Sequence, residues 1–171
     1  MRKLFYIAGI LVILLLGSVA VNMYLSHDSL EDFNGPGYIP PNYQLSGNNT
    51  TENSTFLLYQ GSSQLDLFIV GATKDPDKKV IKSIKSSFNN TTTQSANLII
   101  VKENMTVDDH PVELDREEIN INGVLIDLFE TKWYCDKSKL TITATGIVPA
   151  SEMGEIRKML KSIKCHRDTF F

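Results

Sequence analysis

This chain lacks the short motifs that carry most enzyme chemistry. It has no G-x-S-x-G nucleophile motif and no G-x-G-x-x-G or G-x-x-x-x-G-K phosphate-binding pattern, so the sequence does not support a serine hydrolase or a nucleotide-binding protein. Its 17 Lys and Arg residues are spread along the chain with no basic and aromatic cluster, and the formal net charge is −3. Nucleic acid is therefore not an expected partner, and no cofactor is predicted.

The chain has one long hydrophobic run, from Leu4 to Val21, directly after Arg2 and Lys3. As a helix, about 18 residues at ~1.5 Å each reach roughly 27 Å, close to the ~30 Å hydrocarbon core of a bilayer. The two basic residues favour a cytoplasmic N-terminus. We therefore expect residues 1–25 to form a single transmembrane anchor, with the rest of the chain outside the cytoplasm.

A cleavable signal peptide is the alternative for this segment. Ser18-Val19-Ala20 fits a small-x-small cleavage site, and cleavage after Ala20 would release the domain as a secreted protein. Apolar residues continue as far as Leu25, which favours the anchor. No Cys follows the run, which excludes the acylated cysteine of a lipoprotein.

Composition divides the remaining chain into a linker, a domain and a tail. Residues 26–41 combine Gly, Pro and acidic residues without periodicity, which predicts a tether. Residues 42–165 number roughly 120, an ordinary size for one domain with one core. Residues 166–171 are expected to fray.

Most of this domain reads as β-strand. Asn122-Gly123 between two apolar, alternating runs is a strong signal for a hairpin. Strands are expected in the segments 43–45, 56–60, 65–71, 97–107, 112–114, 117–121, 124–134 and 140–148.

Two helices are predicted among these strands. Asp75 suits an N-cap and Pro76 the first helical position, and an apolar stripe at helical spacing continues to Phe88. A last helix begins at Pro149. Its apolar stripe consists of Met153, Ile156, Leu160 and Ile163. This order predicts an α+β fold, in which one antiparallel sheet packs against two helices after the N-terminal transmembrane helix.

The two cysteines, Cys135 and Cys165, both lie in the predicted exported domain. Outside the cytoplasm a disulfide between them is expected, because one follows a strand and the other the last helix, and a helix packed on the sheet would bring them together. Two free, buried thiols are the alternative. Neither cysteine belongs to a Cys-x-x-Cys spacing typical of metal sites.

Several asparagines match the Asn-x-Ser/Thr glycosylation pattern, which in an exported chain indicates surface positions. Turns rich in Asn and Thr also produce such matches without any glycan. The matching residues are Asn48, Asn49, Asn53, Asn89, Asn90 and Asn104.

Two further features are candidates for binding. Asp108, Asp109 and His110 could bind a hard or borderline cation through two carboxylates and an imidazole, but they match no Ca²⁺ loop, and a solvated turn before Pro111 is the simpler interpretation. Trp133 alternates away from the apolar face of its strand, so it lies either in the core or on a partner surface.

Three places in the chain resemble the PsbP-like family of α/β/α sandwich domains. They are Ile-Pro-Pro-x-Tyr at 39–43, Asn-Gly-Val at 122–124, and Met-Leu-Lys-Ser-Ile-Lys at 159–164. The resemblance covers Tyr38 to Lys164. It implies a non-enzymatic accessory or binding domain and carries over no catalytic residues.

The sequence therefore favours a membrane-tethered, extracytoplasmic accessory domain that binds a protein or small ligand. An envelope structural or adhesion-like module is one alternative. A metal-dependent enzyme that uses Asp108, Asp109 and His110 is the other.

Overall fold

The computed structural model describes residues 30, 33–63, 66–84, 99–121 and 123–166. The expected transmembrane segment, Leu4 to Val21, lies outside these residues. Among the residues that are described, no helix has the length and apolar character needed to cross a membrane.

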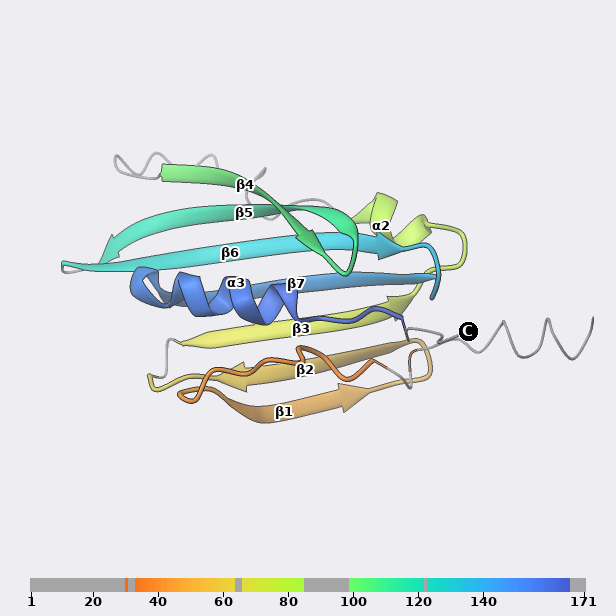
Figure 1. Ribbon diagram of the computed structural model, residues 1–171, viewed down its shortest axis with the longest axis horizontal. Helices are drawn as coiled ribbons and strands as arrows, with labels where there is room; N and C mark the ends of the chain where they lie inside the picture. Colours follow the sequence, from red (N-terminus) through yellow and green to blue (C-terminus); the bar gives the residue numbers. More distant parts are fainter. Residues whose placement is uncertain (1–29, 31–32, 64–65, 85–98, 122, 167–171) are drawn as a thin grey trace, which may run out of the picture.

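A seven-stranded antiparallel sheet forms the body of the domain (Figure 1). Its strand order, β1-β2-β3-β7-β6-β5-β4, joins two meanders at the β3–β7 pair. The chain runs through the first meander, crosses to the far edge, and returns through the second. The strands are β1 (Gln44–Thr50), β2 (Ser54–Gln60), β3 (Leu67–Lys74), β4 (Ile99–Val107), β5 (His110–Ile121), β6 (Val124–Cys135) and β7 (Leu140–Pro149).

The β5–β6 hairpin has the tight connection that the sequence predicts. Ile121 pairs with Val124, which leaves a two-residue turn, and Gly123 adopts a φ of 86°. Gly adopts a positive φ at little cost, which explains why Gly occupies the second position of this turn. The Gly123 N–H also donates to Asn120 Oδ1 over 2.9 Å.

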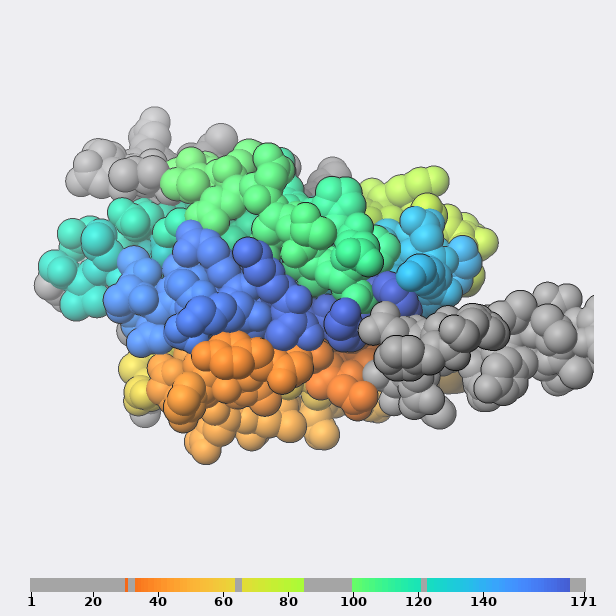
Figure 2. All heavy atoms as spheres, in the orientation of Figure 1, coloured from red at the N-terminus to blue at the C-terminus, as the bar shows by residue number. Residues whose placement is uncertain are grey.

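Helix α3 (Met153–Lys161) covers one face of the sheet and follows a short 3-10 turn at Ala150–Glu152. In Figures 1 and 2, α3 lies beside residues 33–43, the orange segment that runs over β2. The predicted apolar stripe is confirmed, because Met153, Ile156, Leu160 and Ile163 are all at most 2% exposed. The α+β class is confirmed with them.

Alternate residues of the central strands complete this core. Val70 on β3 and Ile142 on β7 are fully buried on the face of the sheet that carries α3, and Phe129 on β6 is 1% exposed on the same face. The Phe129 ring lies against Gly146, where a Cβ atom would come within 2.6 Å of it. Gly146 is therefore required by the close approach of an aromatic ring to the β7 backbone.

The first predicted helix is much shorter than expected. Helix α2 spans only Lys79–Ser83, and Ile84 is already extended. The N-cap residue of α2 is Lys78, so the predicted start at Asp75 and Pro76 is three residues too early, but the Asp75 carboxylate still accepts hydrogen bonds from the first-turn N–H groups of Val80 and Ile81 at 2.9 Å each. The helix is bounded on both sides by residues without helical geometry. Lys78, before it, has a left-handed conformation with a φ of 56°, and Ile84, after it, is extended. Phe88, the expected end of the stripe, lies outside the described residues.

The expected tether is part of the domain from residue 33 onward. Phe33 is 7% exposed and belongs to the core, and Pro36 forms a β-bridge with Ile163. The Gly37 N–H donates to the Ser162 carbonyl over 3.1 Å. The prediction of a free tether rested on the Pro and Gly content of this segment. The same composition is compatible with an extended chain that packs against a helix, which is what the structure has.

An ion-pair network fastens α3 to the sheet. Arg157 on α3 contacts Glu103 on β4 through its Nε and Nη2 atoms, at 2.8 and 2.6 Å. Arg116 on β5 bridges Glu103 and Asp127, at 2.7 Å to each carboxylate. Asp127 is fully buried, so the network places a charge inside the domain and neutralises it there.

This network predicts acid sensitivity. The Arg157 guanidinium, with Arg116, lowers the pKa of Glu103 to about 2 from its ordinary 4.5. A carboxylate with a depressed folded-state pKa stabilises the fold above its unfolded pKa, and that stability is lost as the pH falls from about 4.5 toward 2. We expect a loss of roughly 2–3 kcal/mol over this range in urea unfolding. Glu103→Gln should flatten this pH dependence, and equal slopes for both proteins would contradict it.

Candidate functional site

The candidate site begins at the turn between β4 and β5. Val107 pairs with His110, which leaves Asp108 and Asp109 as the two turn residues. Both have positive φ, 48° and 65°. This geometry matches the twist of a hairpin, and Asp tolerates it better than most residues do. The conformation of the turn is therefore sufficient to explain why two aspartates occur here.

Asp108 also ties this turn to the segment after α3. Its Oδ2 accepts the Cys165 N–H over 2.9 Å, and its Oδ1 accepts from Lys164 Nζ over 3.0 Å. The Asp108 side chain is only 3% exposed. Burial raises the pKa of Asp108, but the Cys165 N–H and the Lys164 ammonium outweigh it and hold that pKa below its ordinary value. Asp108 is thus an ionised anchor for residues 164–166.

Cys135 and Cys165 form a disulfide, as the sequence predicts. Cys135 is the last residue of β6 and Cys165 follows α3, with Cα atoms 6.3 Å apart. Their exposures are 0% and 3%. The bond therefore joins the end of the sheet to the C-terminal segment inside the core.

Two histidines lie against this disulfide. His110 Nε2 is 3.4 Å from Cys165 Sγ, and His166 Nδ1 is 3.5 Å from the same sulfur. The two rings meet edge to face with centroids 6.4 Å apart. We refer to His110, Cys135, Cys165 and His166 as the His–Cys cluster. Its four donor atoms all lie within 4.8 Å of one another.

The cluster differs from the site that the sequence suggested. Asp108, Asp109 and His110 do not converge, because Asp108 is held by Cys165 and Lys164, Asp109 is exposed, and His110 turns to the sulfurs. Of the three, only His110 joins the group. His166 belongs to the segment 166–171, which we expect to fray, and its position next to Cys165 is the one signal in the sequence that could place it at the cluster.

Trp133 occupies the core. It is 4% exposed on the face of β6 that α3 covers, opposite Ile142 of β7. Of the two interpretations of its alternation, the structure has the core position.

The described glycosylation candidates lie along the edges of the sheet. Asn48 and Asn49 are exposed on β1, one edge strand, and Asn104 is exposed on β4, the other. Asn53 lies in the turn that leads into β2, and Asn89 and Asn90 lie outside the described residues. Glycans at these edge positions would prevent pairing with strands of other chains.

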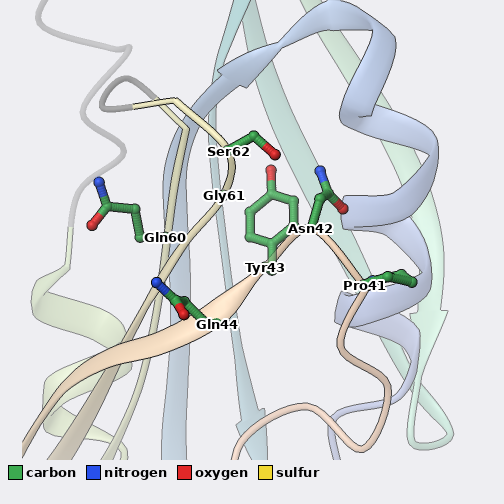
Figure 3. Close-up of a pocket in the computed structure, with 7 residues that line it drawn as sticks. All are labelled: Pro41, Asn42, Tyr43, Gln44, Gln60, Gly61 and Ser62. Atoms are coloured by element: carbon green, nitrogen blue, oxygen red, sulfur yellow. The ribbon is translucent and has the colours of Figure 1, made fainter.

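A shallow pocket near the start of β1 offers little chemistry. In Figure 3 the ring of Tyr43 stands inside it, with its hydroxyl directed toward the turn at Gly61 and Ser62. That hydroxyl donates to the buried Asp66, and burial together with this carboxylate raises the pKa of Tyr43. The lining residues are Pro41, Asn42, Tyr43, Gln44, Gln60, Gly61 and Ser62. The pocket is neutral, and its one titratable group is used in packing.

Comparison with known proteins gives no relative from which a role could be transferred. No protein-family model, no curated protein and no solved structure matches this chain.

Proposed function

We propose that this chain is a membrane-tethered, extracytoplasmic accessory domain that binds a protein partner and catalyses no reaction. The apolar segment from Leu4 to Val21 supports the tether, and its preceding basic residues support export of the domain. The disulfide supports the same compartment, because such bonds persist in oxidising environments. A PsbP-like α/β/α sandwich is the finer fold that we propose for it.

The observation that carries the binding proposal is an apolar strip on the sheet face opposite α3. Phe56 is 41% exposed and Ile69 is 36% exposed, although both lie within central parts of their strands. The strip crosses three neighbouring strands and consists of these two exposed residues and the half-buried Leu58, Leu67 and Ile147. Contiguous exposed apolar side chains of this kind mark interaction sites more often than scattered ones do.

The chemistry of this face indicates the kind of partner. The side chains that β2, β3 and β7 present there are apolar, or are Thr, Ser, Gln and Gly, and none of those described is charged. A charged partner surface would lose its hydration there without finding an opposite charge. The partner that fits is a protein with an uncharged, apolar patch.

Ile69→Lys tests this proposal by placing a charge in the strip. The full chain, expressed in its native membrane with a photo-crosslinking residue at Leu58, should give a defined crosslinked protein, and Ile69→Lys should reduce that product at least about tenfold. The matched control is Val124→Lys, which alters an apolar residue that is 55% exposed at the β5–β6 hairpin. It should leave the product unchanged.

Three outcomes would reject the proposal. Equal loss with both variants would show that the strip is not specific, and the absence of any product would show that it has no protein partner. A product that joins two copies of this chain would favour the envelope structural module instead. The fold should survive in both variants, because substitutions of exposed residues usually change stability by no more than about 0.5 kcal/mol.

A further inference from the structure

We propose that the His–Cys cluster is a Zn²⁺ site that the disulfide closes and that a dithiol reductant opens. The reduced cluster offers two thiolates and two imidazoles, a donor set that suits Zn²⁺ in tetrahedral coordination. This inference concerns a different surface from the apolar strip and does not depend on the proposed function.

The distances between the donors fit this coordination. With Zn–S near ~2.3 Å and Zn–N near ~2.0–2.1 Å, the S···N edge of a tetrahedron is about 3.6 Å. The structure has 3.4 Å from His110 Nε2 to Cys165 Sγ, and 3.5 and 3.7 Å from His166 Nδ1 to the sulfurs of Cys165 and Cys135. Three of the six edges are therefore already in place. Zinc binding requires the two sulfurs to separate once the bond between them is gone, and the other two edges, both from His110, already lie within 4.8 Å.

The fold holds these donors in place without the disulfide. His110 is the first residue of β5 and Cys135 the last of β6, so the sheet fixes both backbones. Cys165 is fixed by its N–H bond to Asp108, and Ile163, two residues earlier, is fully buried. The segment that carries Cys165 and His166 therefore stays against the sheet after reduction. Such preorganisation favours metal binding over release of the C-terminal segment.

The redox step is a thiol–disulfide exchange. A dithiol gives two electrons and two protons to the Cys135–Cys165 bond, becomes a cyclic disulfide itself, and leaves two thiols on the protein. Zn²⁺ then displaces both thiol protons, which pass to solvent, and binds the two thiolates. The metal is not oxidised or reduced. In the reverse exchange an external disulfide takes two electrons from the thiolates and two protons from solvent, becomes a dithiol, and the re-formed Cys135–Cys165 bond releases the metal.

Metal binding requires one local change at His166. Its Nδ1 lies 3.1 Å from Asp108 Oδ2 and its Nε2 lies 2.9 Å from Lys137 Nζ. When Nδ1 binds Zn²⁺, the imidazole proton moves to Nε2, where it faces the Lys137 ammonium. The Lys137 side chain is exposed and can turn away. Lys137→Gln, whose amide oxygen can accept that proton, should therefore tighten zinc binding.

Titration with Co²⁺ and Zn²⁺ tests the proposal directly. The full chain in detergent is reduced with dithiothreitol, freed of it without oxygen, and titrated with Co²⁺. We expect one Co²⁺ per chain, the visible absorption of a tetrahedral ion, a thiolate charge-transfer band, and displacement of both signals by Zn²⁺. The oxidised protein should show none of these signals. Equal signals from oxidised and reduced protein, or none from either, would overturn the proposal.

Substitution of the histidines separates ligands from neighbours. His110→Asn and His166→Asn remove one donor each while keeping the disulfide, and each should weaken Zn²⁺ binding by more than about a hundredfold. Asp109→Asn changes an exposed residue of the same turn and should leave the affinity unchanged. Equal affinity in all three variants would mean that the thiols bind metal without a built site. If the reduced chain unfolds, recovery of its circular dichroism on addition of Zn²⁺ replaces the titration, and no recovery overturns the proposal.

Discussion

Arg116→Ala should lower the free energy of unfolding by about 3–5 kcal/mol, which is among the largest effects of any single substitution in this domain. The Arg116 guanidinium lies 2.7 Å from the carboxylates of both Glu103 and Asp127, and the Asp127 side chain is 0% exposed. Without Arg116, Asp127 is left as an unpaired charge in the core. Urea unfolding of the full chain at neutral pH, followed by circular dichroism, measures the change.

Two further variants make this test specific. Lys79→Ala removes an ion pair with Asp77 at 2.9 Å in which both side chains are more than half exposed, so it should leave the free energy of unfolding nearly unchanged. The double variant Arg116→Met with Asp127→Leu removes both charges and should recover much of the lost stability. If Arg116→Ala costs no more than Lys79→Ala, the network does not hold α3 in place.

This network could not be predicted from the sequence, for a physical reason. On β5 the buried face continues from Val112 and Leu114 to Arg116, so a charged residue takes a core position in the alternation. Alternation predicts strands from apolar residues and treats a charge as a surface position. The Arg116 side chain, 14% exposed, is accommodated there because Glu103 of β4 and Asp127 of β6 pair with it, and Arg157 of α3 shares Glu103. Such a pairing depends on the strand register, which sequence patterns leave open.

The elements that sequence predicted well are those with local causes. Asn122-Gly123 fixes a tight hairpin wherever it lies, and the stripe from Met153 to Ile163 needs only one apolar surface to pack against. The length of α2 had no such local cause. Its apolar residues have helical spacing, but the chain becomes extended at Ile84, whose carbonyl accepts a hydrogen bond from Lys132 of β6. A tertiary contact thus accompanies the end of a helix that propensity alone would continue.

The candidate site was predictable in part for the same reason. The disulfide between Cys135 and Cys165 followed from the order of elements, since a strand end and a helix end meet when the helix packs on the sheet. The two histidines could not be placed in this way. His110 reaches Cys165 only because the β4–β5 turn folds over the end of α3, and His166 reaches it because Asp108 holds residues 164–166. These contacts join segments 55 or more residues apart.

Loss of the disulfide should have the second large effect. The Cys135–Cys165 bond closes a loop with a sequence separation of 30, and a loop of this length corresponds to about 3–4 kcal/mol of chain entropy removed from the unfolded state. We therefore expect reduction by dithiothreitol, with metal removed by a chelator, to lower the free energy of unfolding by that amount. The double variant Cys135→Ala with Cys165→Ala is the control, because its stability should not respond to the reductant at all.

Zinc should reverse much of this loss if the His–Cys cluster binds it. A ligand that binds only the folded state at a hundred times its dissociation constant contributes about 2.7 kcal/mol, close to the contribution of the bridge. The reduced protein should thus regain most of its stability in Zn²⁺, whereas the reduced His110→Asn variant should not. If the reduced protein is as stable as the oxidised one before any metal is added, the bridge does not constrain the unfolded chain as argued. If Zn²⁺ stabilises the double alanine variant equally, its effect arises outside the cluster.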